Sequence, residues 1–191
     1  MIRKVAFFGF SEAKSEDQVF KDAQATAKLL AKEGYLILNG GGPGIMKASS
    51  LGAKEGGGKV IGVSFYPAGA THFEGRDPSN PLDEEIKCPN YVERTLKLIE
   101  LGDVYVIFSG GTGTISEFGM AWGLARIYFG NHKPLILFGS FWHEITEAIG
   151  KNMLLRPEAL RVYKIVTKPQ EVLEAIQDFD QEKRPPRGQG R

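Results

Sequence analysis

Short apolar runs alternate with longer amphipathic segments along the chain. Six apolar runs predict buried strands, at residues 4–9, 35–39, 59–65, 103–108, 134–139 and 163–167. The segments between and after them predict helices, at residues 15–34, 43–57, 90–102, 114–130, 141–154 and 169–179. This alternation is typical of an α/β fold. We expect a Rossmann-like, doubly wound parallel sheet of about six strands with helices on both faces.

Three segments depart from this alternation. Residues 66–88 are polar and predict a long loop, which in a compact domain is often functional. Residues 181–191 lack apolar side chains, so we expect a single domain over 1–180 and a disordered tail over 181–191. The segment 114–130 is apolar on several faces, which requires either a further layer of this chain or another subunit. A patch of that size favours a homodimer or larger homo-oligomer.

Composition and charge exclude several classes of protein. The 191 residues carry a net charge of +1, which gives no field to attract nucleic acid or an anionic membrane. No apolar run is long enough to span a bilayer, and the first residues are too short an apolar stretch for a signal peptide, so we expect a cytoplasmic protein. The three histidines and Cys88 show no metal-ligand spacing, so we predict no metal and no cofactor.

Two glycine-rich stretches carry the candidate chemistry, NGGGPGIM at 39–46 and SGGTGTISE at 109–117. Each follows a predicted strand and precedes a helix, so both lie at the sheet edge where α/β proteins bind ligands. The free N–H groups of a helix start bind phosphate, and glycine lets an anion come close. The candidate substrate-binding residues are Gly41, Gly42, Gly44, Gly110, Gly111, Thr112, Gly113 and Thr114. The alternative is that either stretch is only a tight turn, and neither matches G-x-G-x-x-G or a P-loop.

Arg94 and Glu117 are the candidate catalytic residues. The helix 90–102 runs antiparallel to the strand that follows it, so Arg94 in its first turns can reach Glu117 over the second glycine stretch. A carboxylate and an arginine beside a phosphate site suit cleavage of an N-glycosidic bond, which passes through a sugar cation. The alternatives are that Glu117 completes a capping box with Thr114, and that Arg94 is a solvated or structurally paired arginine.

The motifs GGGPGIM (40–46) and ERTLKLIELGDVYVIFSGGTGTISE (93–117) resemble the LOG ("lonely guy") family, long labelled putative lysine decarboxylases. The resemblance covers nearly the whole chain and implies a Rossmann-like fold, a dimer or larger assembly, and nucleoside 5′-monophosphate phosphoribohydrolase activity. It implies roles for Arg94, for the glycine loop and for Glu117. It also matches Gly9 and Ser11 to the family's early turn, which borders the same crevice.

The substrate that the resemblance implies is an AMP-like nucleotide, and in cytokinin-forming members its base is an N6-substituted adenine. Three positions depart from the family pattern, namely Phe10, Thr95 and Ser109. Non-catalytic relatives of this fold carry nucleotide-like ligands, including molybdenum cofactor. A binding or carrier protein is therefore the alternative to an enzyme.

Overall fold

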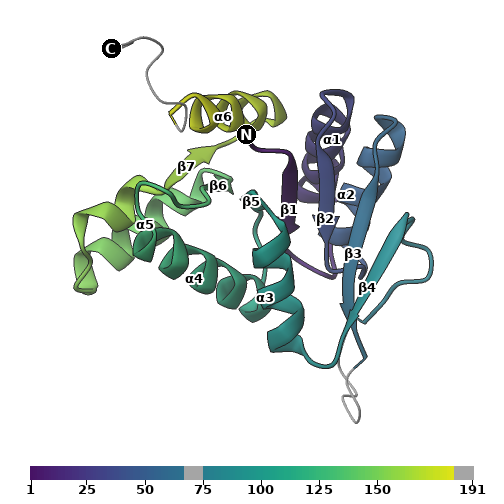
Figure 1. Ribbon diagram of the computed structural model, residues 1–191, viewed down its shortest axis with the longest axis horizontal. Coiled ribbons are helices and arrows are strands. Elements are labelled where there is room, and N and C mark those ends of the chain that lie inside the picture. The colour runs from purple at the N-terminus through teal and green to yellow at the C-terminus, as the bar shows by residue number, and fades with distance from the viewer. Residues whose placement is uncertain (67–74, 183–191) are drawn as a thin grey trace, which may run out of the picture.

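Seven parallel strands form one sheet in the computed structural model, which describes residues 1–66 and 75–182 (Figure 1). The strands are β1 (Lys4–Phe8), β2 (Leu36–Asn39), β3 (Val60–Phe65), β4 (Glu84–Cys88), β5 (Val104–Ile107), β6 (Leu135–Phe138) and β7 (Tyr163–Val166). They lie in the order β4-β3-β2-β1-β5-β6-β7, and all neighbouring pairs are parallel. The predicted Rossmann-like α/β fold is confirmed, with one strand more than expected.

Six α-helices cover the two faces of this sheet (Figure 1). They are α1 (Gln18–Lys32), α2 (Ile45–Glu55), α3 (Tyr91–Leu101), α4 (Thr112–Ile127), α5 (Phe141–Asn152) and α6 (Pro169–Glu182), with a short 3₁₀ helix at Pro157–Arg161. Helices α1, α2 and α6 share one hydrophobic cluster, and α3, α4 and α5 share the other. Helix α6 extends two residues into the predicted tail, whose remaining residues, 183–191, lie outside the described part of the chain.

Alternation along each strand explains why both faces need helices. In β1, Val5 and Phe7 pack into the cluster that includes α1 and α2, whereas Ala6 and Phe8 pack into the other. A strand buried on both faces has no polar side, so it reads as a continuous apolar run. This is the pattern that predicted the six recognised strands.

The strand that the hydrophobic pattern missed is β4, which lies inside the predicted loop 66–88. Its sequence, EEIKC, is mostly charged and none of its residues is fully buried. Strand β4 pairs only with β3, at the edge of the sheet, so its side chains do not need to be apolar. The prediction of a loop over 84–88 is therefore wrong.

Strand order reverses beside β1. Strands β2, β3 and β4 follow on one side of it and β5, β6 and β7 on the other. The loops after β1 and β5 consequently leave the sheet next to each other, and the Phe10 N–H donates to the Ser109 carbonyl at 3.0 Å. Such a reversal leaves a crevice beyond the carboxyl ends of the strands, where doubly wound proteins bind their ligands.

No helix within residues 1–66 and 75–182 combines the length and the apolar character needed to cross a bilayer.

Candidate functional site

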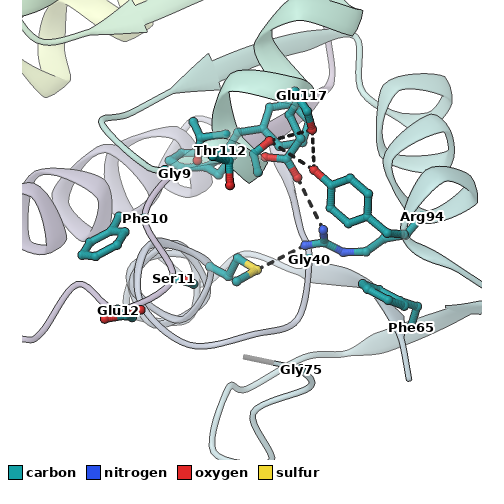
Figure 2. A pocket seen from close by; sticks show the side chains of 18 of the residues that line it. Gly9, Phe10, Ser11, Glu12, Gly40, Phe65, Gly75, Arg94, Thr112 and Glu117 are labelled. Carbon is teal, nitrogen blue, oxygen red and sulfur yellow. Dashed lines mark hydrogen bonds and ion pairs between the residues drawn. The ribbon is translucent and has the colours of Figure 1, made fainter. Parts of the chain in front are cut away.

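A cavity of about 720 Å³ opens at the reversal point between β1 and β5 (Figure 2). The loop after β1, the loop after β5 and the first turns of α3 and α4 contribute to its wall. Predicted site residues in this wall are Gly9, Ser11, Arg94, Gly111, Thr112, Gly113, Thr114 and Glu117. The structure thus brings most of the predicted residues to one place.

Arg94 lies in the second turn of α3 and is only 7% exposed. Its Nε donates to the carbonyl of Val63 at 3.1 Å, and its Nη1 lies 3.4 Å from Glu117 Oε1. The expected meeting of the two side chains across the loop after β5 therefore occurs. Burying a charge is costly unless it is paired, and here the pair lies in the wall of a cavity rather than in the core.

Gly40 makes room for the Arg94 guanidinium (Figure 2). A Cβ at position 40 would lie 1.5 Å from Arg94 Nη2. Gly40 is the one residue of the stretch 40–44 that lines the cavity among the described residues. Its effect on the site is steric, because it sets where the guanidinium can lie.

Glu117 is 6% exposed and faces Arg94 from the second turn of α4. Burial raises the pKa of its carboxyl to about 7, while the Arg94 guanidinium acts in the opposite direction and lowers this pKa. A carboxyl with a pKa near neutrality can both hold and release a proton under physiological conditions. A raised carboxyl pKa beside a specific charged partner in a cavity is one of the features that mark candidate functional sites.

The alternative role of Glu117, as half of a capping box with Thr114, is wrong. Helix α4 starts at Thr112 with Gly111 as its N-cap, and Ile115 N–H donates to the Gly111 carbonyl at 3.0 Å. Thr114 is thus inside the helix, and Glu117 lies one turn too late to cap it. The Glu117 carboxylate instead contacts the Arg94 guanidinium and lines the cavity.

The start of α4 supplies hydrogen-bond donors to the cavity. Because the first bond of the helix runs from Ile115, the N–H groups of Thr112, Gly113 and Thr114 have no acceptor within the helix. These residues line the cavity, and Gly111, Thr112 and Gly113 are exposed. Free donors at the positive end of a helix favour an anion, and phosphate is the usual one.

Gly110 is close to this group but does not line the cavity. A Cβ at Gly110 would lie 2.1 Å from Thr114 Oγ1 and 3.0 Å from the Phe10 backbone nitrogen. The sequence predicts that Gly110 contacts the substrate, but in the structure its observed role is in packing. The absence of a side chain lets the loops after β1 and β5 approach each other.

The first glycine stretch behaves differently from its prediction. Gly41, Gly42 and Gly44 are buried and none of them lines the cavity. Asp77 N–H donates to the Gly41 carbonyl at 3.1 Å, and Asn80 Nδ2 donates to the Gly42 carbonyl at 2.8 Å. The segment that precedes β4 therefore covers Gly41 and Gly42. These glycines contribute to the packing around the site and do not line the cavity.

Tyr91 is a cavity residue that the sequence reasoning missed. It lies three residues before Arg94, so both side chains project from the same face of α3. Its hydroxyl lies 2.5 Å from Ser116 Oγ and 3.1 Å from the Gly113 carbonyl. The spacing to Arg94 was the only available signal, because a tyrosine at a helix start usually packs without a specific role.

Metal ligands do not gather in the described part of the chain, where no three His, Cys, Asp or Glu side chains form a cluster that could hold an ion. The donor groups that do converge are backbone N–H groups and a guanidinium. Such a set suits an anionic organic ligand.

Comparison with protein families agrees with this geometry. The model of the SLOG cluster4 family matches residues 2–166, which include both glycine stretches, Arg94 and Glu117. The chain belongs to the SLOG cluster4 family. Membership confirms the resemblance to LOG proteins that the two motifs indicated.

Two curated relatives of this SLOG protein cover most of its length. The Probable cytokinin riboside 5′-monophosphate phosphoribohydrolase of Oryza sativa subsp. japonica is 25% identical over 190 residues, covering 93% of this chain and 72% of the relative. An uncharacterized protein of Archaeoglobus fulgidus is 30% identical over 125 residues, covering 65% of this chain and 78% of the relative.

Among solved structures, the molybdenum cofactor binding protein of Rippkaea orientalis superimposes with a TM-score of 0.70. It is 24% identical in sequence, and the match covers 94% of this chain and 98% of that protein. A similarity at this identity shows a shared fold. The SLOG fold thus occurs both in proteins named as hydrolases and in proteins named for binding a cofactor.

Proposed function

We propose that this SLOG protein hydrolyses the N-glycosidic bond of a purine nucleoside 5′-monophosphate, giving the free base and ribose 5-phosphate. The observation that carries the proposal is the buried Arg94–Glu117 pair, 3.4 Å apart, in a cavity that also holds the free N–H groups of α4. A carrier needs the anion site, but it has less need of a buried carboxyl with a pKa near neutrality.

The start of α4 binds the 5′-phosphate in this proposal. The donors are the N–H groups of Thr112, Gly113 and Thr114, with the Thr112 and Thr114 hydroxyls in the same turn. Gly9 and Ser11, on the loop after β1, form the neighbouring wall of the same cavity. Arg94 orients the ribose phosphate and balances the charge of Glu117.

Glu117 acts on the sugar. As the bond between C1′ and the base nitrogen breaks, its electron pair leaves with the base and positive charge develops on the ribose ring. The Glu117 carboxylate stabilises this charge, and then accepts a proton from the water that attacks C1′. The departing base takes up a proton from solvent, and Glu117 returns the proton that it accepted from water to solvent, so that atoms and charge balance.

The name of the Oryza sativa relative supports an adenine base carrying an N6 substituent, as in a cytokinin riboside monophosphate. Phe10 stands on the loop after β1, lines the cavity and is 39% exposed, so its ring can face a base. We include AMP and its N6-substituted derivatives as substrates.

The outer face of α4 supports a homodimer. Ile115 and Ile127 are more than 60% exposed, which leaves apolar area uncovered along the helix that carries Glu117. We propose that a second copy covers this face, and that the protein acts in the cytoplasm as an assembly of at least two chains.

The experiment is incubation with AMP and with N6-isopentenyl-AMP, followed by chromatography of the released base. We expect release from the wild type and a loss of about 10³-fold in Glu117→Gln, because the amide can neither accept the proton nor stabilise the cation. Glu117→Gln should still bind ribose 5-phosphate, since the anion site is intact.

The control is Glu100→Gln, which removes a carboxylate from an exposed position at the other end of α3. It should release base like the wild type. A wild type that binds nucleotide but releases no base from any monophosphate would overturn the enzymatic proposal. That result, with an intact ligand retained through purification, would favour the carrier alternative.

A further inference from the structure

Two sets of polar side-chain contacts join α3 to α4 at the cavity. One is the Arg94–Glu117 pair, and the other is the Tyr91 hydroxyl against Ser116 Oγ and the Gly113 carbonyl. Ser116 Oγ in turn donates to the same Gly113 carbonyl at 2.9 Å. The hydrogen bonds of the second set therefore meet at one peptide group in the first turn of α4.

The peptide group between Gly113 and Thr114 carries two polar atoms. Its carbonyl oxygen, from Gly113, accepts hydrogen bonds from the Tyr91 and Ser116 hydroxyls. Its N–H group belongs to Thr114. A peptide is planar and trans, so its C=O and N–H point in opposite directions, and fixing one fixes the other. The Thr114 N–H is among the helix-start donors that have no acceptor within the helix.

Glycine at position 113 makes such a restraint useful. Without a Cβ, residue 113 has more backbone freedom than any other type of residue would have there. Residues 111–113 are exposed, so few side chains pack around them. As a member of the first turn of α4, the Gly113 carbonyl is also the acceptor of a helical hydrogen bond, and the Tyr91 hydroxyl adds a second restraint from a neighbouring helix.

We propose that Tyr91 is a positioning residue for phosphate binding. Its hydroxyl fixes the 113–114 peptide plane and so keeps the Thr114 N–H directed toward the phosphate. This proposal rests on the proposed function for the identity of the anion. It assigns Tyr91 a role through its hydroxyl, distinct from the packing of its ring edge-on against Phe65 at 6.0 Å.

The ring contacts make Tyr91→Phe the informative variant. A phenylalanine retains the packing on Phe65 and the ring beside Arg94, and removes only the hydroxyl. If the ring alone mattered, the variant would behave as the wild type. If the hydroxyl positions the peptide, the loss appears in ligands that carry a phosphate.

The matched control is Tyr105→Phe. The Tyr105 hydroxyl is buried and donates to the Ile99 carbonyl at 2.7 Å, near the far end of the same helix, α3. It does not line the cavity. Its loss should lower the unfolding midpoint without changing the affinity for any phosphate-bearing ligand.

Binding of ribose 5-phosphate and of ribose should be measured by calorimetry, and base release from AMP by chromatography. For Tyr91→Phe we expect Kd for ribose 5-phosphate and KM for AMP to rise about five- to tenfold, with a smaller change in kcat. Ribose should bind equally to both forms. Ser116→Ala should have the same effect, and adding it to Tyr91→Phe should bring little further loss, because both hydroxyls act on one carbonyl.

Unchanged Kd for ribose 5-phosphate in Tyr91→Phe would overturn the inference, whatever happens to the unfolding midpoint. An equal loss in Tyr105→Phe would also overturn it, since the effect would then be general destabilisation. Binding is measured separately from turnover, so the two proposals can fail independently. A wild type that binds ribose 5-phosphate but releases no base refutes the hydrolase and leaves the Tyr91 test intact.

Discussion

The two glycine stretches have similar composition and similar places in the fold, but opposite surroundings. Residues 40–42 and 44 are buried, and the carbonyls of Gly41 and Gly42 accept hydrogen bonds from the segment before β4. Residues 110–113 are exposed, and the N–H groups at the α4 start have no acceptor within the helix. The second stretch lines the cavity with three consecutive residues, 111–113, whereas the first contributes only Gly40 within the described part of the chain.

The backbone conformation shows why glycine occurs in each stretch. Gly41 and Gly44 have φ values of +72° and +61°, which side chains rarely adopt. The glycines of the second stretch are not among those with positive φ. Glycine thus serves the shape of the chain in the first stretch and access for a ligand in the second.

The largest expected contrast is between Gly44→Ala and Gly111→Ala. A Cβ at Gly44 would lie 2.3 Å from the Phe10 carbonyl oxygen, a backbone atom, and would also have a strained φ. We expect Gly44→Ala to lower the free energy of unfolding by about 2–4 kcal/mol. A Cβ at Gly111 would meet nothing within 4 Å, so Gly111→Ala should change the free energy of unfolding by about 0.5 kcal/mol or less.

Urea denaturation of both variants measures this contrast. Equal destabilisation by the two substitutions would show that the stretches do not differ in the way their surroundings indicate. A large loss confined to Gly111→Ala would reverse the assignment of the structural and the ligand-facing stretch.

Gly40→Ala tests the contact between the first glycine stretch and the Arg94 guanidinium. The new Cβ would collide with the Arg94 guanidinium, which is the end of a flexible side chain and moves more readily than backbone. We expect base release to fall about 10–100-fold as Arg94 leaves Glu117, with a smaller loss of stability than in Gly44→Ala. Gly150→Ala, in α5 with nothing near its Cβ, is the control and should retain full activity.

The pH profile of the same variant shows whether Arg94 has moved. Glu117 must be ionised to accept a proton, and its pKa is raised to about 7, so wild-type base release should fall about tenfold per pH unit below that value. Arg94 lowers this pKa, so its displacement in Gly40→Ala should raise it and move the acid limb to higher pH. A limb that stays in place, or moves to lower pH, would mean that Arg94 has not left the carboxylate.

Much of the fold could be predicted because buried parallel strands are continuous apolar runs, as in β1 and β5. Strand β4 could not be found in this way, since an edge strand tolerates charged residues on its open side. The meeting of Arg94 with Glu117 followed from the antiparallel course of α3 and β5, which depends only on element order and length.

The different fates of the two glycine stretches could not be predicted from their residues. The difference comes from Asp77 and Asn80, which lie more than thirty residues from the carbonyls that they cover. The role of Tyr91 likewise depends on a distance between two helices and on the orientation of a hydroxyl. Local patterns carry no information on such contacts, because they arise from packing between distant segments.

The smallest expected effect comes from Asn80→Ala, which removes part of the cover from the first stretch. The substitution loses the hydrogen bond from Nδ2 to the Gly42 carbonyl, at 2.8 Å. It also removes Oδ1, a buried oxygen that has no hydrogen-bond partner within the described part of the chain. These two changes oppose each other, so we expect a loss of about 1 kcal/mol in the free energy of unfolding. Base release should be unchanged, because Gly42 does not line the cavity. A fall in base release without a comparable fall in stability would show that the first stretch, like the second, contacts the ligand.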